Sequence, residues 1–359
     1  MNRPMSEPTD ERADPGPVPG PDPAATNGPV IEHHHPAPGG GRLRVACWDG
    51  AAFSEWEGID GIADRLGRPG TSLWIDLAGP TAKQVAALTG VLRLHPLVAE
   101  DIVEGNQRSK IELTEDHIHI VIFALRFVDA VVASEIDIVL GEGFLLTVHD
   151  PEWDPWTTHH LRDGVAPVLQ HGPDHMLWAL VDTVVDDYFP LVDRLGDAID
   201  DLQDTVVRSA TPLTLERLFR LKRELLLVRR AVGPVREIFN QLTNRDLKLV
   251  DQGEILYFRD VYDHLIRLTD EVDTYRELVS GTLDVYLSTV NNNLSLIMKR
   301  LTGITVILAG IGAIAGIFGM SEAGAALAGS EAPGFWLVTA FTVAAALVVV
   351  WYLRQIDWI

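Results

Sequence analysis

Two apolar stretches close to the end of the chain decide its fold: residues 301–319 (LTGITVILAGIGAIAGIFG) and residues 335–353 (FWLVTAFTVAAALVVVWYL). Neither contains a charged residue. A helix of about twenty apolar residues spans the hydrocarbon core of a bilayer, where only helices and closed barrels satisfy their own backbone hydrogen bonds. The two stretches therefore predict two transmembrane helices, joined by a short loop over residues 320–334.

The charges that flank these stretches predict their orientation. Lys299 and Arg300 precede the first stretch and Arg354 follows the second, whereas the loop between them carries only Glu322 and Glu331. By the positive-inside rule, both ends of the chain are cytoplasmic and the loop is external. Repeated around a ring of subunits, the two loop acids would concentrate cations at an outer mouth. Ordinary exposed loop charges are the other interpretation.

A regular apolar pattern leads into the first span from its N-terminal side. The members recur only at intervals of three and four residues, as on one face of a helix: Phe258, Val261, Leu265, Leu268, Val272, Tyr275, Val279, Leu283, Tyr286, Val290, Leu294, Ile297 and Leu301. The pattern predicts a stalk helix over residues 253–300 that continues into the span as one rod of roughly 65 residues, about 100 Å long. Such a stripe must pack against the chain's own domain or against other copies.

The roughly 300 residues before the first span predict a cytoplasmic body with more than one part. Residues 1–42 are rich in proline and glycine and are expected to be disordered. Residues 43–175 mix short β-prone runs with helical spacing, including a hairpin turn at Gly141-Glu142-Gly143, and predict an α/β domain. Residues 176–252 predict an antiparallel pair of helices with a break near Pro212.

Six aspartates of the first predicted helix of this pair recur at intervals of three, four or seven residues and so share one face: Asp182, Asp186, Asp193, Asp197, Asp200 and Asp204. A solvated helix face and a cation-attracting surface both fit this spacing.

Net charge and motif content argue against several classes of function. The formal charge of −22 disfavours nucleic acid as a partner and is compatible with attracting cations. The single cysteine, Cys47, cannot form an internal disulfide and is expected to be a small buried hydrophobe in a reducing compartment. No phosphate-binding glycine loop, nucleophile elbow or zincin helix occurs in the sequence. An enzyme is therefore not expected, and no cofactor is required.

Two spans cannot enclose an aqueous path, so a transport function would require an oligomer around a central axis. One face of the first span changes from bulky to small residues toward the outside: Met298, Leu301, Thr305, Ala309, Gly312 and Gly316. Close helix packing through small residues and the lining of a pore both account for this face.

The end of the first span, Ile314-Ala315-Gly316-Ile317-Phe318-Gly319-Met320-Ser321, closely resembles the same point in the CorA-type metal ion transporter family, whose signature there is Gly-Met-Asn. Similar segments extend the resemblance over roughly residues 43–359: 74–77 (WIDL), 94–102 (LHPLVAEDI), 185–189 (VDDYF), 257–264 (YFRDVYDH), 283–288 (LDVYLS) and 298–302 (MKRLT).

The resemblance implies a homopentamer in the cell membrane, with an α/β cytoplasmic domain, a long stalk helix, a pore-lining first span and an outer second span. Its implied partners are its own copies, the lipid bilayer and divalent cations. The family moves Mg2+, often also Co2+ or Ni2+, whereas its ZntB-like branch moves Zn2+. The implied pore-lining set begins in the stalk with Asp284, Leu287 and Ser295 and continues through the face described above.

Gly319, Met320 and Ser321 correspond to the family's selectivity ring, in which an asparagine amide holds the hydrated ion. A serine hydroxyl accepts hydrogen bonds but reaches less far, so this departure bears on selectivity. The family's proline in the first span also corresponds to Gly310 here. Zn2+ transport and a non-conducting membrane sensor or scaffold with a degenerate ring are the alternatives.

The resemblance also implies regulatory Mg2+ sites between subunits that hold the pore closed. The matching residues of the first are Asp101, with Glu100 beside it, facing Asp260 of the next stalk. The second matches Asp182 and His264. A cation that bridges subunits only in the closed state would shift the population toward that state. Mg2+ is thus expected as both cargo and regulatory ligand.

Overall fold

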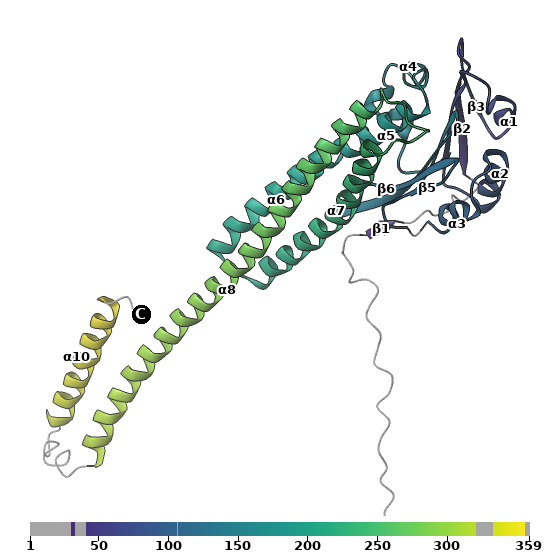
Figure 1. The fold of residues 1–359 in the computed structure, drawn as a ribbon. Helices are drawn as coiled ribbons and strands as arrows, with labels where there is room; N and C mark the ends of the chain where they lie inside the picture. The colour runs from purple at the N-terminus through teal and green to yellow at the C-terminus, as the bar shows by residue number, and fades with distance from the viewer. Residues whose placement is uncertain (1–29, 33–40, 106, 321–332, 356–359) are drawn as a thin grey trace, which may run out of the picture.

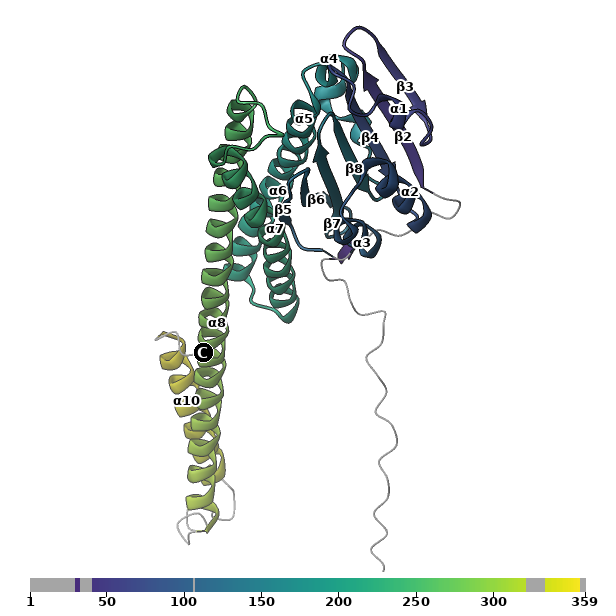
Figure 2. The same cartoon turned by 45° about the vertical axis from the view of Figure 1, so that its right-hand side comes forward.

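The computed structural model describes residues 30–32, 41–105, 107–320 and 333–355. A sheet with helices on both faces forms one end of the molecule, and a single long helix, α8 (Ile255–Met320), leads away from it (Figure 1). The helix α10 (Pro333–Gln355) lies beside the far end of α8 in both views (Figures 1 and 2). The fold is a mixed α/β domain joined to a long helix.

The sheet has eight strands, seven of them in the order β3-β2-β4-β8-β7-β6-β5. Their bounds are β2 Arg42–Trp48, β3 Phe53–Glu57, β4 Ser72–Ala78, β5 Lys110–Leu113, β6 His117–Phe127, β7 Val131–Gly141 and β8 Phe144–His149. Within this path only β4 and β8 pair in parallel. The predicted hairpin at Gly141-Glu142-Gly143 is confirmed, because β7 and β8 pair antiparallel across it.

Each face of the sheet carries its own apolar core because successive side chains of a strand point to opposite faces. On β2, Val45 and Cys47 belong to one core and Ala46 to the other. The first core lies under α1 (Ile62–Arg65), α2 (Ala82–Leu92) and α3 (Pro96–Glu104). The second core packs against the helices that follow the sheet. Cys47 is fully buried and free, as predicted.

Two strands do not appear in the sequence prediction: β3 (FSEWE) and β5 (KIEL). Both lie at an edge of the sheet, are short and carry charges, so they lack the continuous apolar run that marks a buried strand. A third, β1 (Val30–Glu32), pairs in parallel with Val132–Ser134 of β7 and falls within residues 1–42. The expectation of disorder is therefore wrong for these three residues, whose apolar β-branched pair suits a strand. Residues 1–29 and 33–40 lie outside the described residues.

Four further helical elements follow β8 before the bundle: η2 (Pro155–Thr157), η3 (His159–Leu161), α4 (Ala166–Leu169) and α5 (Pro173–Asp186). The helix α6 (Tyr188–Arg208) follows α5 after Asp187, and α7 (Pro212–Asn244) follows α6. The break predicted near Pro212 lies between α6 and α7. There the Thr211 side chain caps α7, and Pro212 occupies the first turn of that helix, where a missing N–H costs nothing. The helices α6, α7 and α8 pack together as a bundle.

The predicted stalk stripe is present on α8 but is buried along only part of its length. Phe258, Val261, Leu265, Leu268 and Val272 are fully buried among α5, α6 and α7. Farther along the same face, Leu294 and Leu301 are 54% and 56% exposed. The bundle thus covers the stripe as far as Tyr286, which is 8% exposed, with Val290 packed against the same core. The last three members, Leu294, Ile297 and Leu301, have no partner among the described residues of one chain.

Candidate functional site

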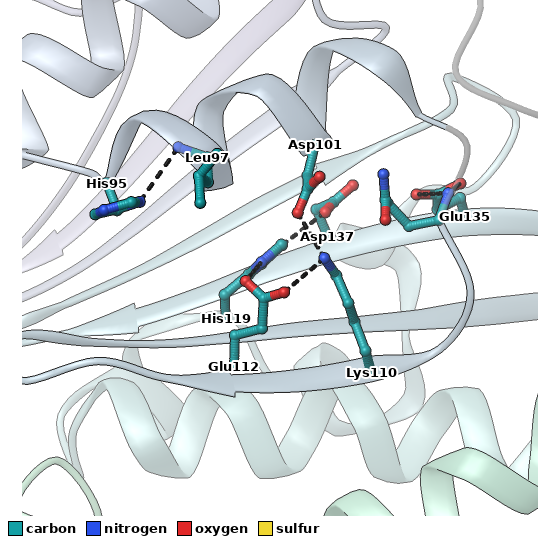
Figure 3. A network of polar contacts seen from close by, with 9 residues as sticks. His95, Leu97, Asp101, Lys110, Glu112, His119, Glu135 and Asp137 are labelled. Atoms are coloured by element: carbon teal, nitrogen blue, oxygen red, sulfur yellow. Dashed lines mark hydrogen bonds and ion pairs between the residues drawn. The ribbon is translucent and has the colours of Figure 1, made fainter.

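Asp101, the first predicted regulatory residue, projects from α3 toward β5 and β6 (Figure 3). Pro96 lies in the first turn of α3, and His95 caps the helix by accepting a hydrogen bond from the Leu97 N–H. The Asp101 carboxylate receives Lys110 Nζ at 2.5 Å, and the same ammonium contacts Glu112 Oε1 at 2.8 Å. A cation of the chain itself therefore neutralises the predicted metal ligand.

Charge pairing at this point shifts the pKa values of Lys110 and Glu112. Burial opposes the charge of Lys110, but its hydrogen bonds to Asp101 and Glu112 outweigh burial and raise the pKa of the ammonium. The hydrogen bond from Lys110 lowers the pKa of Glu112. A divalent ion at Asp101 must share its carboxylate with Lys110 or displace it. Sequence reasoning missed Lys110, although it lies only nine residues beyond Asp101.

His119 lies behind this pair and is fully buried on β6. Its Nε2 donates to Asp137 Oδ1 at 2.8 Å, while its Nδ1 lies 3.8 Å from Glu112 Oε2 (Figure 3). One ligand atom each from Asp101, Glu112 and His119 lie within 4.8 Å of one another. The group has metal-ligating donors, but Lys110 already bridges its two carboxylates.

Asp260, the predicted partner of Asp101, is exposed on α8. Glu100 is exposed on α3. Among the described residues, no hydrogen bond or ion pair joins Asp260 to Glu100 or Asp101. The predicted pairing across subunits stays a prediction, since it concerns a second copy of the chain.

The second predicted pair, Asp182 and His264, is brought together within one chain. Asp182 is buried on α5, and one ligand atom each from Asp182, Asp186 and His264 lie within 4.8 Å of one another. Asp182 and Asp186 are separated by one helical turn, so the cluster gathers two carboxylates on one side. Burial and then the neighbouring charge of Asp182 raise the pKa of Asp186, while His264 opposes that shift.

Two histidines complete this group and are absent from the sequence prediction. His160 Nε2 donates to Asp182 Oδ2 at 2.7 Å, and His159 Nε2 lies 3.7 Å from Asp186 Oδ2. Both belong to η3, more than twenty residues before the aspartates. The adjacent histidine pair was the available signal, but its spacing from Asp182 does not show that the two meet. Farther along, Asp193, Asp197, Asp200 and Asp204 are exposed on α6.

The predicted pore-lining residues lie on the uncovered part of α8. All are exposed in the single chain: Asp284, Leu287, Ser295, Met298, Leu301, Thr305, Ala309, Gly312 and Gly316. Two of them bond to their own helix, because Ser295 Oγ donates to the Asn291 carbonyl and Thr305 Oγ1 donates to the Leu301 carbonyl. The rest of the face is apolar or small apart from Asp284.

A different face of α8 carries its less exposed residues. Gly303 is buried, and Ile307 and Ile314 are half-buried, beside α10. Each stands two residues after a predicted pore-lining residue, which is about 200° around the helix. The small-residue face at Ala309, Gly312 and Gly316 is therefore not the face that packs against α10. Within one chain, the packing interpretation of that face finds no partner among the described residues.

The predicted ring at the end of the first span is only partly described. Gly319 and Met320 are the last residues of α8. Ser321, Glu322 and Glu331 lie outside the described residues. By length and composition, α8 contains an apolar segment within Ile255–Gly316 that is long enough to cross a membrane. The part of α10 over Thr339–Gln355 is a shorter apolar helix.

Comparison with known proteins identifies relatives that match most of the chain. Residues 70–355 match the family described as CorA-like Mg2+ transporter protein. The chain is 34% identical over 257 residues to the cobalt/magnesium transport protein CorA of Thermotoga maritima, covering 70% of this chain and 73% of that protein. It is 30% identical over 249 residues to the putative metal ion transporter YfjQ of Bacillus subtilis, covering 69% and 78%.

A solved structure shares the fold. The complete structure of the CorA magnesium transporter from Methanocaldococcus jannaschii superposes with a TM-score of 0.74 at 22% identity, covering 88% of this chain and 98% of that one. At this identity the similarity concerns the fold, in which an α/β domain is continued by a long helix.

Proposed function

Because the chain belongs to the family of CorA-like Mg2+ transporter proteins, we propose that it carries Mg2+, and with it Co2+ or Ni2+, into the cell through a homopentameric pore. The chain is a divalent cation transporter of the CorA family, and its relatives are transporters rather than enzymes. Zn2+ is the alternative cargo.

The exposed face of α8 is the observation that carries this proposal. Met298, Leu301 and Thr305 face away from α10 and from the cytoplasmic body, so one chain leaves them uncovered. Five copies arranged around an axis would cover this face and enclose a path that two helices alone cannot. Met298 and Leu301 would form an apolar constriction near the cytoplasmic end.

The electrochemical gradient is sufficient to drive entry. A divalent ion that moves into a negative-inside cell gains about 4.6 kcal/mol per 100 mV, twice the value for one charge. With both termini cytoplasmic, the α/β domain samples the internal cation concentration. The loop acids Glu322 and Glu331 would then face the side from which cations enter.

Selection would take place at Gly319, Met320 and Ser321, at the outer end of the first span. Mg2+ releases water reluctantly, so a ring of neutral oxygens holds the ion through its hydration shell. Five serine hydroxyls make a looser ring than five amides. We expect Ser321→Asn to sharpen the preference for Mg2+ over Co2+ and Zn2+ in uptake assays. An unchanged ranking of the three ions would show that this ring does not set selectivity.

Inhibition by internal Mg2+ would act through Asp101 and Glu100 with Asp260 of the next subunit. Lys110 supports a reversible arrangement, because its ammonium neutralises Asp101 in the single chain. When Mg2+ bridges two subunits, it would have to displace the Lys110 ammonium from Asp101. This competition lowers the affinity for Mg2+, so the ion can leave again when its internal concentration falls.

Dye-monitored uptake into proteoliposomes tests the proposal. Mg2+, Co2+ and Zn2+ are supplied outside, with and without a negative-inside potential. We expect uptake of Mg2+ that the potential accelerates. Absence of uptake for every ion, from liposomes that contain assembled pentamers, would contradict transport and favour the non-conducting sensor.

A further inference from the structure

Five side chains meet at the junction of η3, α5 and α8, and we refer to them as the histidine cluster: His159, His160, Asp182, Asp186 and His264. One ligand atom each from His159, His160 and Asp182 lie within 4.8 Å of one another, and the same holds for Asp182, Asp186 and His264. Asp182 belongs to both groups. The two groups therefore form one continuous set of donors inside a single subunit.

Two atoms of the cluster are buried without a hydrogen bond. Asp182 is 6% exposed, and its Oδ1 accepts no hydrogen bond in the described part of the chain, although its Oδ2 is held by His160. His264 Nδ1 likewise makes no hydrogen bond within the described residues, although it lies 3.7 Å from Asp186 Oδ1, within ion-pair distance. A buried polar atom without a partner costs about 1–3 kcal/mol, so these atoms are arranged for a ligand that supplies the missing contact.

The charges around the cluster favour a cation. Across the residues that the structure describes, Asp182 and Asp186 form ion pairs only with histidines. This distinguishes the cluster from Asp101, whose carboxylate is already occupied by Lys110. A divalent cation would relieve the repulsion between the two aspartates without displacing a lysine.

We propose that the histidine cluster is a transition-metal site, selective for cations of the Zn2+ and Co2+ class over Mg2+. Imidazole nitrogens suit Zn2+, Co2+ and Ni2+, whereas Mg2+ takes oxygen ligands in an octahedral shell and keeps several waters. His159, His160 and Asp182 provide the first group of ligands, with Asp186 and His264 beside them. The metal site itself does not depend on the proposed function. Its consequence for regulation does: in a cation transporter of this family, the regulatory ion at Asp182 and His264 would not be Mg2+.

The surroundings support ordered ligands. Thr183 Oγ1 lies 3.4 Å from His159 Nδ1, and the His160 ring lies 4.6 Å from the Trp178 ring, centroid to centroid. Such contacts fix the orientation of metal-binding rings. A metal ion at this point would replace the hydrogen bond between His160 Nε2 and Asp182 Oδ2 and would bind the imidazole tautomer that carries its proton on Nδ1.

Co2+ binding to the full-length protein in detergent provides the test. His33, His34 and His35 are first replaced by alanine so that the N-terminal tail contributes no imidazole. Co2+ is titrated and followed by its visible absorption, and Zn2+ or Mg2+ is then added as competitor. We expect one Co2+ per subunit with nitrogen-ligated bands, displaced by equimolar Zn2+ and retained in a large excess of Mg2+.

The double variant His159→Ala/His160→Ala should lower the Co2+ affinity at least about tenfold, since even the loss of a supporting residue has that effect at metal sites. His171→Ala is the matched control, because His171 is exposed and lies against the ring of His175, outside the cluster, with ring centroids 4.9 Å apart. Zn2+ should also raise the melting temperature of the parent protein but not of the double variant, and His159→Gln/His160→Gln serves if the alanine variant does not fold.

Equal Co2+ affinity in the parent and the double variant, or displacement of Co2+ by equimolar Mg2+, would overturn the site. Metal binding in detergent and cation uptake by liposomes are separate readouts. Loss of one therefore does not imply loss of the other.

Discussion

The two halves of α8 carry the same three-and-four spacing of apolar residues but have opposite environments. Around Phe258 and Leu265 the stripe is buried against α5, α6 and α7. Around Leu294 and Leu301 the stripe is more than half exposed. Periodicity therefore establishes that a helix has an apolar face, whereas the partner of that face depends on the rest of the assembly. The first half is completed within one chain, whereas the second half is left uncovered, and the proposed oligomer would cover it.

The largest expected difference between the halves lies in folding stability. Phe258→Ala should destabilise the body formed by the sheet and the helical bundle by about 3–5 kcal/mol, because a fully buried aromatic ring packed on Phe239 is replaced by a cavity. Leu294→Ala should leave the unfolding of that body unchanged. Urea unfolding of the detergent-solubilised protein, followed by tryptophan fluorescence, measures both. Equal losses would show that the two halves are packed alike.

A buried polar network holds the body together without help from a second chain. Asp76 accepts hydrogen bonds from Thr147 Oγ1 at 2.6 Å, Trp156 Nε1 at 2.7 Å and His149 Nε2 at 3.0 Å. Burial alone would lower the pKa of His149, but the hydrogen bond and charge of Asp76 outweigh it and raise that pKa above its ordinary value. The pair therefore stabilises the fold fully below the unfolded-state pKa of His149, about 6.5.

Asp76→Asn should cost about 1.5–3 kcal/mol in acid solution, where the charged histidine is paired with a carboxylate. The loss should become smaller as the pH rises through the raised pKa of His149, because the imidazole is then neutral in both proteins. Urea unfolding at pH 5.5 and at pH 9 compares the two conditions. A loss that grows with pH would show that the carboxylate does not stabilise a protonated His149.

Asp260, an exposed acid of α8, should affect gating rather than folding. Asp260→Ala should raise the internal Mg2+ concentration that half-inhibits uptake about fivefold or more, which is the lower range of measured allosteric couplings. Asp263→Ala is the matched control, because Asp263 is also exposed on the same helix three residues away. Inhibition curves from proteoliposomes loaded with Mg2+ give both values. Equal inhibition of the parent and Asp260→Ala would remove Asp260 from the sensor.

The sequence predicts those features of the fold that arise from local spacing. The single rod of α8, the hairpin before β8 and the helix break at Pro212 follow from periodicity and from turn and cap residues, and all three are confirmed. The edge strands β3 and β5 escape prediction because their pairing with β2 and β6 compensates for short, charged sequences.

The site residues also fall into those that the sequence predicts and those that only the tertiary structure reveals. Resemblance to a family identifies Asp101, Asp182 and His264, but it does not identify the side chains that fold against them. Lys110 reaches Asp101 from a neighbouring strand, and His160 reaches Asp182 from a separate 3-10 turn. These contacts depend on tertiary structure, and no spacing in the chain encodes them. In the proposals made above, these contacts also determine which cation each site would accept.

Thiol accessibility tests most directly whether the uncovered face of α8 lines the cation path. In a Cys47→Ala background, Thr305→Cys places a thiol on this face and Ile307→Cys places one about 200° away, on the side of α10. Divalent cation uptake by proteoliposomes is measured before and after a positively charged thiol reagent. We expect the reagent to block uptake in Thr305→Cys and to spare it in Ile307→Cys. Block in Ile307→Cys with Thr305→Cys unaffected would contradict the account.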